Sequence, residues 1–235
     1  MELTNKYKKH MFTSFFQLID SKWRPLHLLV VKNQKKLILF FLLFECLVLL
    51  LIPLGFWIRV SQPKSYYLFF ELGSKMGVVS FVFYLATLIP GILKRLKILP
   101  LMTASMMLFR RHLGIFMFLA AITHLILVST IPKLFTYSAI TLDIFTQREI
   151  FGIVAMLLLF PLWLTSNDYS VVHLGKYWEW IHRLTYFALF LIFLHVALLE
   201  FSLGLIGAMV IILEIISWIF TLKKIRPPRS GFKPD

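Results

Sequence analysis

The chain has 235 residues, of which 59% are hydrophobic and 15% are charged, and its mean hydropathy is +0.82. Soluble domains carry about 25% charged residues, so this composition excludes an ordinary soluble protein and indicates an integral membrane protein. The formal net charge of +14 does not indicate nucleic-acid binding, because the basic residues lie between and outside the apolar segments, where anionic lipid headgroups attract them.

The first 36 residues are basic and lack the single short apolar core of a cleaved signal peptide. We expect 1–36 to form a basic cytoplasmic or interfacial segment. Two interpretations remain for it. Its FTSFFQLID and LHLLVV stretches form an interfacial helix on the membrane surface, or the segment is a basic tail that only sets the topology.

A helix needs about 20 apolar residues to cross the bilayer core. Six segments meet this requirement and predict an all-α, polytopic membrane protein, a six-transmembrane-helix bundle. They are 37–58, 74–93, 112–131, 149–165, 180–200 and 203–221. The predicted organisation is therefore an N-terminal segment over 1–36, a transmembrane domain over 37–221 and a basic cytoplasmic tail over 222–235.

The basic residues alternate between the two sides of the membrane. Eight lie in 1–36, five in 94–111 and five in 222–235, whereas 59–73 and 132–148 hold two each. Because cytoplasmic segments carry the excess of Lys and Arg, both termini are expected in the cytoplasm. The third and fifth spans then both start at the cytoplasmic face.

A single cysteine, Cys46, lies inside the first span. One cysteine excludes an intramolecular disulfide, a thiolate-ligated iron–sulfur cluster and a Cys-x-x-Cys-His haem attachment. Any haem in this chain must therefore be bound non-covalently.

Two of the seven histidines lie deep inside predicted spans, His124 in GIFMFLAAITHLILVST and His195 in FLIFLHVALL. His10, His27 and His173 fall outside the spans, where solvated side chains need no special function. An unpaired ionisable side chain in hydrocarbon is costly. An intramembrane histidine therefore indicates either a functional site or a hydrogen bond to a facing Ser or Thr.

His124 and His195 each lie about a dozen residues from the cytoplasmic start of a span, and the two spans run in the same direction. Both imidazoles are therefore expected at similar depth. Two such imidazoles are the axial ligands of a b-type haem iron, and the many Phe and Leu residues suit its apolar macrocycle. We predict His124 and His195 as axial ligands of haem b.

His112 and His182 begin the same two spans and are candidates for a second haem. They precede His124 and His195 by 12 and 13 residues, or roughly 18 and 20 Å along a helix. The same offsets turn the paired histidines about 120° and 140° apart, so a second haem requires a kink, a tilt or another helix face. Contact with haem propionates, a flavin or lipid headgroups is the alternative interpretation.

Three arginines adjoin these histidines: Arg110 and Arg111 precede His112, and Arg183 follows His182. Their guanidinium groups are candidates to bind haem propionates or a flavin or quinone headgroup through charge-assisted hydrogen bonds. The alternative is that they are topogenic side chains that extend to the membrane interface.

RRHLGIFMFLAAITHL (110–125) and LTSNDYSVVHLGKYWEWIHRLTYFALFLIFLH (164–195) resemble the ferric reductase-like transmembrane domain family. The likeness covers about 74–221 and is strongest to the haem-binding membrane subunit of the bacterial periplasmic methionine sulfoxide reductase system. The long basic N-terminus departs from that pattern.

The resemblance implies that His124, His182 and His195 are haem iron ligands. The Arg110-Arg111-x-Leu-Gly element also matches the family. His112 stands where close relatives usually have an apolar residue, so its candidacy depends on its spacing from His124.

The resemblance also implies a location, the bacterial inner membrane, and a pathway. Electrons enter from a cytoplasmic flavin reductase or the quinone pool, with FMN or quinone as a further cofactor. They leave through haem b to a periplasmic molybdenum-containing reductase. The chain has no G-x-G-x-x-G segment, so we expect the electron-transfer subunit of an oxidoreductase rather than a complete enzyme.

Two rival functions remain. One is a ferric or other metal-ion reductase module within the same fold. The other is a non-redox transporter or scaffold, in which the histidines bond to neighbouring helices or relay protons. A membrane hydrolase is disfavoured, because neither H-E-x-x-H nor G-x-S-x-G occurs.

Overall fold

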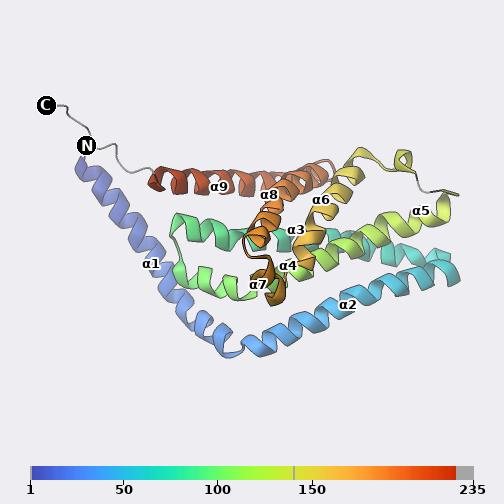
Figure 1. Ribbon diagram of the computed structural model, residues 1–235, viewed down its shortest axis with the longest axis horizontal. Helices are drawn as coiled ribbons and strands as arrows, with labels where there is room; N and C mark the ends of the chain where they lie inside the picture. The colour runs from blue at the N-terminus through green and yellow to red at the C-terminus, as the bar shows by residue number, and fades with distance from the viewer. Residues whose placement is uncertain (1, 140, 226–235) are drawn as a thin grey trace.

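A computed structural model describes residues 2–139 and 141–225, and helices form the regular structure of this part of the chain (Figure 1). Six of the described helical stretches are long and apolar enough to cross a bilayer. The prediction of an all-α bundle with six transmembrane helices is confirmed. The start of α1 and the end of α9 lie at the same end of the molecule (Figure 1), which the charge pattern predicts to be cytoplasmic.

The elements follow one another with short connections. They are α1 (Glu2–Lys32), α2 (Gln34–Ser61), the 3-10 turn η1 (Pro63–Ser65), α3 (Tyr66–Leu96), α4 (Pro100–Leu125), the π-helical turn η2 (Ile126–Thr130), α5 (Ile131–Thr136), the 3-10 turn η3 (Leu142–Ile144), α6 (Gln147–Leu164), α7 (Asp168–Leu174), α8 (Lys176–Ala197) and α9 (Phe201–Ile225).

Each spanning helix begins before its predicted apolar segment, because polar and basic residues outside the bilayer core continue the helical hydrogen bonding. The third span starts earliest relative to the prediction, at Pro100 rather than at residue 112. The predicted basic tail starts within α9, and its residues 226–235 lie outside the described part of the chain.

The predicted N-terminal segment forms a long helix that docks against the start of α4. Asp20 is buried and accepts a hydrogen bond from the backbone N–H of Leu101 at 3.0 Å, which satisfies a donor that the first helical turn leaves free. Trp23 donates to the Ser105 hydroxyl, and the Nδ1 atom of His27 lies 2.8 Å from the same oxygen. His27, expected in solvent, therefore belongs to a helix–helix contact.

A tight turn sets α3 antiparallel to α4. Lys97 ends α3 with a φ of 58°, and Leu99 precedes α4 with a φ of 51°. Left-handed backbone at non-glycine residues costs on the order of 1 kcal/mol each. Pro100 then starts α4, where its missing N–H leaves no hydrogen bond unmade.

The main core fills the space between α3, α4, α6, α8 and α9. Its members are apolar side chains and one tyrosine: Phe81, Tyr84, Leu85, Leu88, Met117, Phe118, Leu119, Leu159, Ala188, Leu189 and Val196. The hydroxyl of Tyr84 donates to the carbonyl oxygen of Thr185 at 2.5 Å. A buried tyrosine needs such a partner, and this bond ties α3 to α8.

The third span changes its helical repeat directly after His124. The π-helical turn Ile126–Thr130 widens the helix before α5, and such turns leave backbone carbonyls without their usual partner. The hydroxyl of Tyr66 donates to the carbonyl oxygen of Leu127 at 2.6 Å. The irregular segment is thereby stabilised from α3, and it adjoins a predicted site residue.

Candidate functional site

A cavity of about 420 Å³ lies among α3, α4, α6 and α8, where the first halves of α3 and α6 meet the last turns of α4 and α8. Its wall contains both histidines predicted to lie at matching depth, His124 from α4 and His195 from α8. The wall is largely apolar, with Phe70, Phe81, Ile153, Met156, Leu159 and Ile192 among its side chains. Its volume is in the range of sites that hold small molecules or cofactors.

The two intramembrane histidines lie opposite each other. Their ring centroids are 6.4 Å apart, and the ring planes make an angle of 71°. Both side chains are partly buried. The structure therefore brings His124 and His195 together, as the matching depth of the two residues on parallel helices predicts.

Each of these histidines uses the same ring nitrogen to bond to a helix backbone. Nδ1 of His124 lies 2.9 Å from the carbonyl oxygen of Gly73, and Nδ1 of His195 lies 2.7 Å from the carbonyl oxygen of Arg148. A carbonyl oxygen only accepts, so Nδ1 carries the proton in both rings. The neutral tautomer then leaves the lone pair of Nε2 available to bind a metal.

The donor set fits a haem iron. Metal–imidazole bonds are about 2 Å long, so an iron between two Nε2 atoms places the ring centroids roughly 6 Å apart, close to the 6.4 Å in the structure. The cavity beside the rings offers the apolar surroundings that a macrocycle needs. His124 and His195 are therefore the residues that would hold haem b here.

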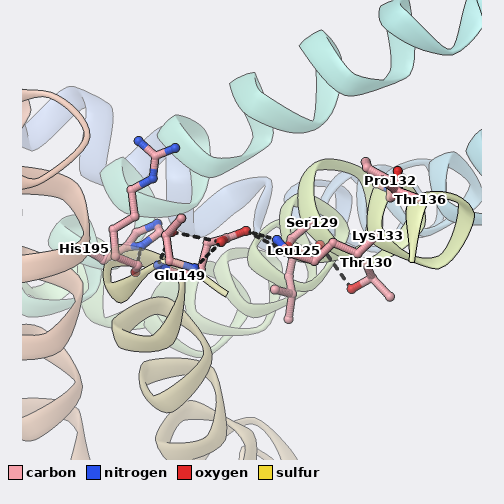
Figure 2. Close-up of polar contacts among 10 residues, drawn as sticks. Leu125, Ser129, Thr130, Pro132, Lys133, Thr136, Glu149 and His195 are labelled. Carbon is pink, nitrogen blue, oxygen red and sulfur yellow. Dashed lines mark hydrogen bonds and ion pairs between the residues drawn. The ribbon is translucent and has the colours of Figure 1, made fainter. Parts of the chain in front are cut away.

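A polar network closes one side of the cavity. Glu149, at the first turn of α6, forms ion pairs with Lys133 and accepts a hydrogen bond from Ser129 at 2.9 Å. Its other oxygen accepts the backbone N–H of Thr146 at 2.8 Å in a capping box. Figure 2 shows these contacts running from the vicinity of His195 toward α5.

Arg148 is the residue of this region that sequence reasoning missed. Its carbonyl holds His195, and the residue lies at the cavity wall, so its positive charge lies near the site where a cofactor would bind. At sequence level Arg148 is one of two basic residues in a sparse connection and was counted only for topology. The sequence feature that could have indicated this role is the position of Arg148 at the start of the fourth span.

His112 and His182 lie in surroundings different from those of His124 and His195. The ring of His112 stacks on Phe41 of α2, with centroids 6.2 Å apart. The ring of His182 stacks on Trp178 at 4.0 Å, and its Nε2 atom lies 3.3 Å from the Thr165 hydroxyl. The two rings thus face different helices, and neither lines the cavity described above.

The three predicted cofactor-binding arginines lie outside the cavity wall. Arg111 forms an ion pair with Asp168 at 2.6 Å, and this hydrogen bond holds the pKa of the Asp168 carboxyl below its usual value. Arg183 lies over the ring of Trp180. Arg110 is within electrostatic range of Glu214. Arg111 and Arg183 thus have partners within the protein, and the cofactor role of the three arginines stays a prediction.

The remaining two histidines are His173 and His10. Nδ1 of His173 lies 2.8 Å from the carbonyl oxygen of Tyr169, and the ring stacks on that tyrosine. The side chain of His10 lies outside the described part of the structure.

The fold and the site define a class, a polytopic helical membrane protein with a histidine-lined cavity inside the membrane. Residues 76–193, about half of the chain, match the family described as ferric reductase like transmembrane component. The chain belongs to this family, as its motifs predict. The six spans and the family fit a multi-pass protein of the bacterial inner membrane.

Curated relatives share the same region. The chain is 37% identical over 82 residues to the protein-methionine-sulfoxide reductase heme-binding subunit MsrQ of Brucella anthropi, which covers 34% of this chain and 37% of that relative. It is 35% identical over 86 residues to the MsrQ subunits of Brucella ovis and Brucella canis, 36% of this chain and 39% of each relative. The chain thus spans less than two fifths of the relatives it matches. No solved structure matches it.

Proposed function

We propose that this protein is a haem b electron-transfer subunit that carries electrons across the membrane. One observation supports this most directly: His124 and His195 face each other across 6.4 Å beside an apolar cavity, and both have Nδ1 bonded to a backbone carbonyl. A hydrogen bond from an axial histidine to a carbonyl is the usual way a protein orients such a ligand.

The chain's own residues bind and position the cofactor. His124 and His195 would hold the haem iron through their Nε2 atoms, and the apolar wall would limit the access of water to it. Arg148 supplies positive charge at the cavity wall for the haem carboxylates. The bound haem supplies the one-electron chemistry, and the protein sets its position and potential.

The direction of transfer is proposed from charge and from the relatives. The basic segments place the ends of the chain on the cytoplasmic side, where a flavin reductase or a quinol would donate electrons, with FMN or quinone as a further cofactor. The relatives are named as heme-binding subunits of a protein-methionine-sulfoxide reductase. A periplasmic molybdenum-containing methionine sulfoxide reductase is therefore the proposed acceptor.

A second haem remains a proposal for the cytoplasmic half. His182 carries the family resemblance, and His112 lies at the corresponding position on α4. The different partners of the two rings argue against a bis-histidine site there. A second haem at His182 would need another ligand or would require His182 to contact haem carboxylates instead.

The test is an absorption spectrum of the purified full chain, as isolated and after dithionite. We expect Soret and α bands of low-spin haem b, and a pyridine haemochrome assay that gives one or two haems per chain. A protein purified from haem-sufficient cells without dithionite-reducible bands contradicts the proposal and favours a non-redox transporter or scaffold.

The rival within the family is a ferric or metal-ion reductase module, which the family description itself supports. Reduced protein in liposomes distinguishes the two. Rapid oxidation of the haem by the periplasmic methionine sulfoxide reductase, with slow oxidation by ferric chelates, supports the acceptor proposed here, and the reverse order supports the rival.

A further inference from the structure

A glycine lies against each of the two intramembrane histidines. On α3, the carbonyl of Gly73 accepts the Nδ1 proton of His124, and Gly77 follows four residues later. In an α-helix the carbonyl of residue i points toward residue i+4, so the side chain of residue i+4 borders any second donor that approaches this carbonyl. At Gly77 no side chain stands in the way.

The same arrangement recurs on α6, in a different pair of helices. The carbonyl of Arg148 accepts the Nδ1 proton of His195, and Gly152 again follows four residues later. Both glycines line the cavity. Two unrelated segments thus place a glycine at the same position relative to the carbonyl that holds a histidine.

The clearances show that a side chain at either glycine would crowd the histidine ring, more strongly at Gly77 than at Gly152. A Cβ atom at Gly77 would lie 2.8 Å from Nδ1 of His124 and 2.9 Å from its Cε1 atom. At Gly152 it would lie 3.0 Å from Nδ1 of His195 and 3.1 Å from its Cε1 atom. Such distances lie inside van der Waals contact. A side chain at Gly77 must displace the imidazole ring, and a side chain at Gly152 requires the ring to move by a few tenths of an ångström.

Other glycines of the bundle do not share this feature. A Cβ atom at Gly114, on the same helix as His124, would meet no atom within 4 Å. At Gly55 the nearest atoms would be in the side chains of Leu127, at 2.4 Å, and Phe69, at 3.3 Å, so this position crowds side chains other than histidine. Contact with a histidine ring is therefore specific to Gly77 and Gly152 among these four, and the other two serve as controls.

We infer that Gly77 and Gly152 are positioning residues for the axial ligands. The missing side chain lets each imidazole reach a helical carbonyl, which fixes the proton on Nδ1 and presents Nε2 to the haem iron. The hydrogen bond also makes the imidazole a stronger electron donor, which favours ferric iron. This inference depends on the proposed haem function and adds residues that the histidine pattern does not contain.

The first experiment compares Gly77→Ala and Gly152→Ala with Gly114→Ala and Gly55→Ala, each in the full-length chain. We expect haem affinity to fall roughly tenfold or more in the first two, the loss typical when the hydrogen bond to a metal-binding histidine is removed. Haem that remains should show a higher midpoint potential and altered electron paramagnetic resonance of its ferric form. Gly114→Ala and Gly55→Ala should keep the wild-type potential and resonance.

A second experiment needs no haem. Gly77→Ala is combined with His124→Ala, and the thermal stability of the four apoproteins is compared in a double-mutant cycle. With the ring removed, the new Cβ atom has nothing to displace, so Gly77→Ala should destabilise the wild type and not the His124→Ala variant. The matching cycle joins Gly152→Ala with His195→Ala.

The outcomes separate the two proposals. Wild-type haem affinity, potential and resonance in Gly77→Ala and Gly152→Ala, or additive stability changes in both cycles, overturn the role of the glycines and leave the haem proposal standing. A wild-type protein that binds no haem overturns the proposed function, while the cycles still report whether the glycines position the rings.

Discussion

The helices α4 and α8 each carry two histidines. The pair near the C-terminal ends of these helices and the pair nearer their starts have different surroundings. At the end near the cavity, His124 and His195 face each other, and both donate to a backbone carbonyl. In the middle of α4, His112 stacks on a phenylalanine of α2, and its buried Nδ1 atom has no hydrogen-bond partner among the described residues. His182 instead contacts Trp178 and Thr165.

The difference shows that a similar spacing of histidines does not make two similar sites. A ligand pair needs a common cavity, a free Nε2 atom on each ring and a partner that orients Nδ1. The first pair satisfies all three conditions, whereas the second pair is divided between two different interfaces. The experiments below test this contrast, beginning with the largest expected effect.

Replacing either cavity histidine should abolish the low-spin haem of the cavity. His124→Ala and His195→Ala each remove one of two axial bonds, so we expect loss of most of this haem in both variants. Haem per protein and the reduced-minus-oxidised spectrum measure the effect. His173→Ala, at a histidine with only local contacts, is the matched control. Full haem content in both alanine variants would disprove this ligand pair.

The opposite pair should respond unequally. We expect His182→Ala to reduce or shift a second spectral component if the protein holds two haems, because His182 matches the family pattern. His112→Ala should leave the haem content unchanged, since its ring packs against Phe41. Spectra of the two variants under the same titration with dithionite provide the comparison. Equal losses in both would restore a His112–His182 ligand pair.

The charge of Arg148 should affect the haem more than the other arginines do. Arg148→Gln keeps the backbone carbonyl that holds His195 and removes a positive charge beside the cavity. We therefore expect weaker haem retention by a few-fold and a lower midpoint potential, because positive charge near a haem stabilises its reduced form. Arg111→Gln, at a residue paired with Asp168 outside the cavity, is the control. A potential that moves equally in both variants would remove Arg148 from the site.

The network at Glu149 should contribute stability more than haem affinity. Glu149→Gln preserves a residue that can complete the capping box and removes the charge that pairs with Lys133. A hydrogen bond to a charged partner contributes about 2 kcal/mol, so we expect a lower thermal midpoint with an unchanged haem spectrum. Lys133→Met should lower it similarly. Thermal unfolding in detergent, followed by circular dichroism, measures both.

The smallest effect concerns the Arg111–Asp168 ion pair. The pKa of Asp168 is lowered by its bond to Arg111, so its contribution is present above the unfolded pKa of about 4 and is lost as the pH falls through the folded value. We expect Asp168→Asn to lower the thermal midpoint slightly at pH 7 and by less at pH 3. The pair is exposed, so the difference is small and decreases with added salt.

Several features could be predicted from sequence because they depend on the bilayer. The six spans follow from segment length and hydropathy, and the depth of His124 and His195 follows from counting residues along parallel helices. The angular offset between the histidines of one helix was also informative: the 120° rotation from His112 to His124 agrees with His112 facing α2 while His124 faces α3.

Other features depend on which helix faces lie together. The hydrogen bond from the start of α4 to Asp20 joins residues far apart in the sequence. No local sequence pattern therefore predicts that α1 docks against α4. The carbonyl partners of the histidines are backbone atoms, which no residue pattern marks. Arg148 entered the sequence interpretation as a topogenic charge, because its position beside the cavity depends on the packing of α6 against α8.

The sequence by itself determined a six-span helical membrane protein, its family and the depth of two histidines, because hydrophobic length and helical rise are properties of each segment alone. The tertiary structure decided which histidines meet, since this depends on the rotation of each helix about its axis. It also assigned a role to Gly77 and Gly152. A glycine carries no functional group, so its role can be recognised only from the imidazole ring that lies against it.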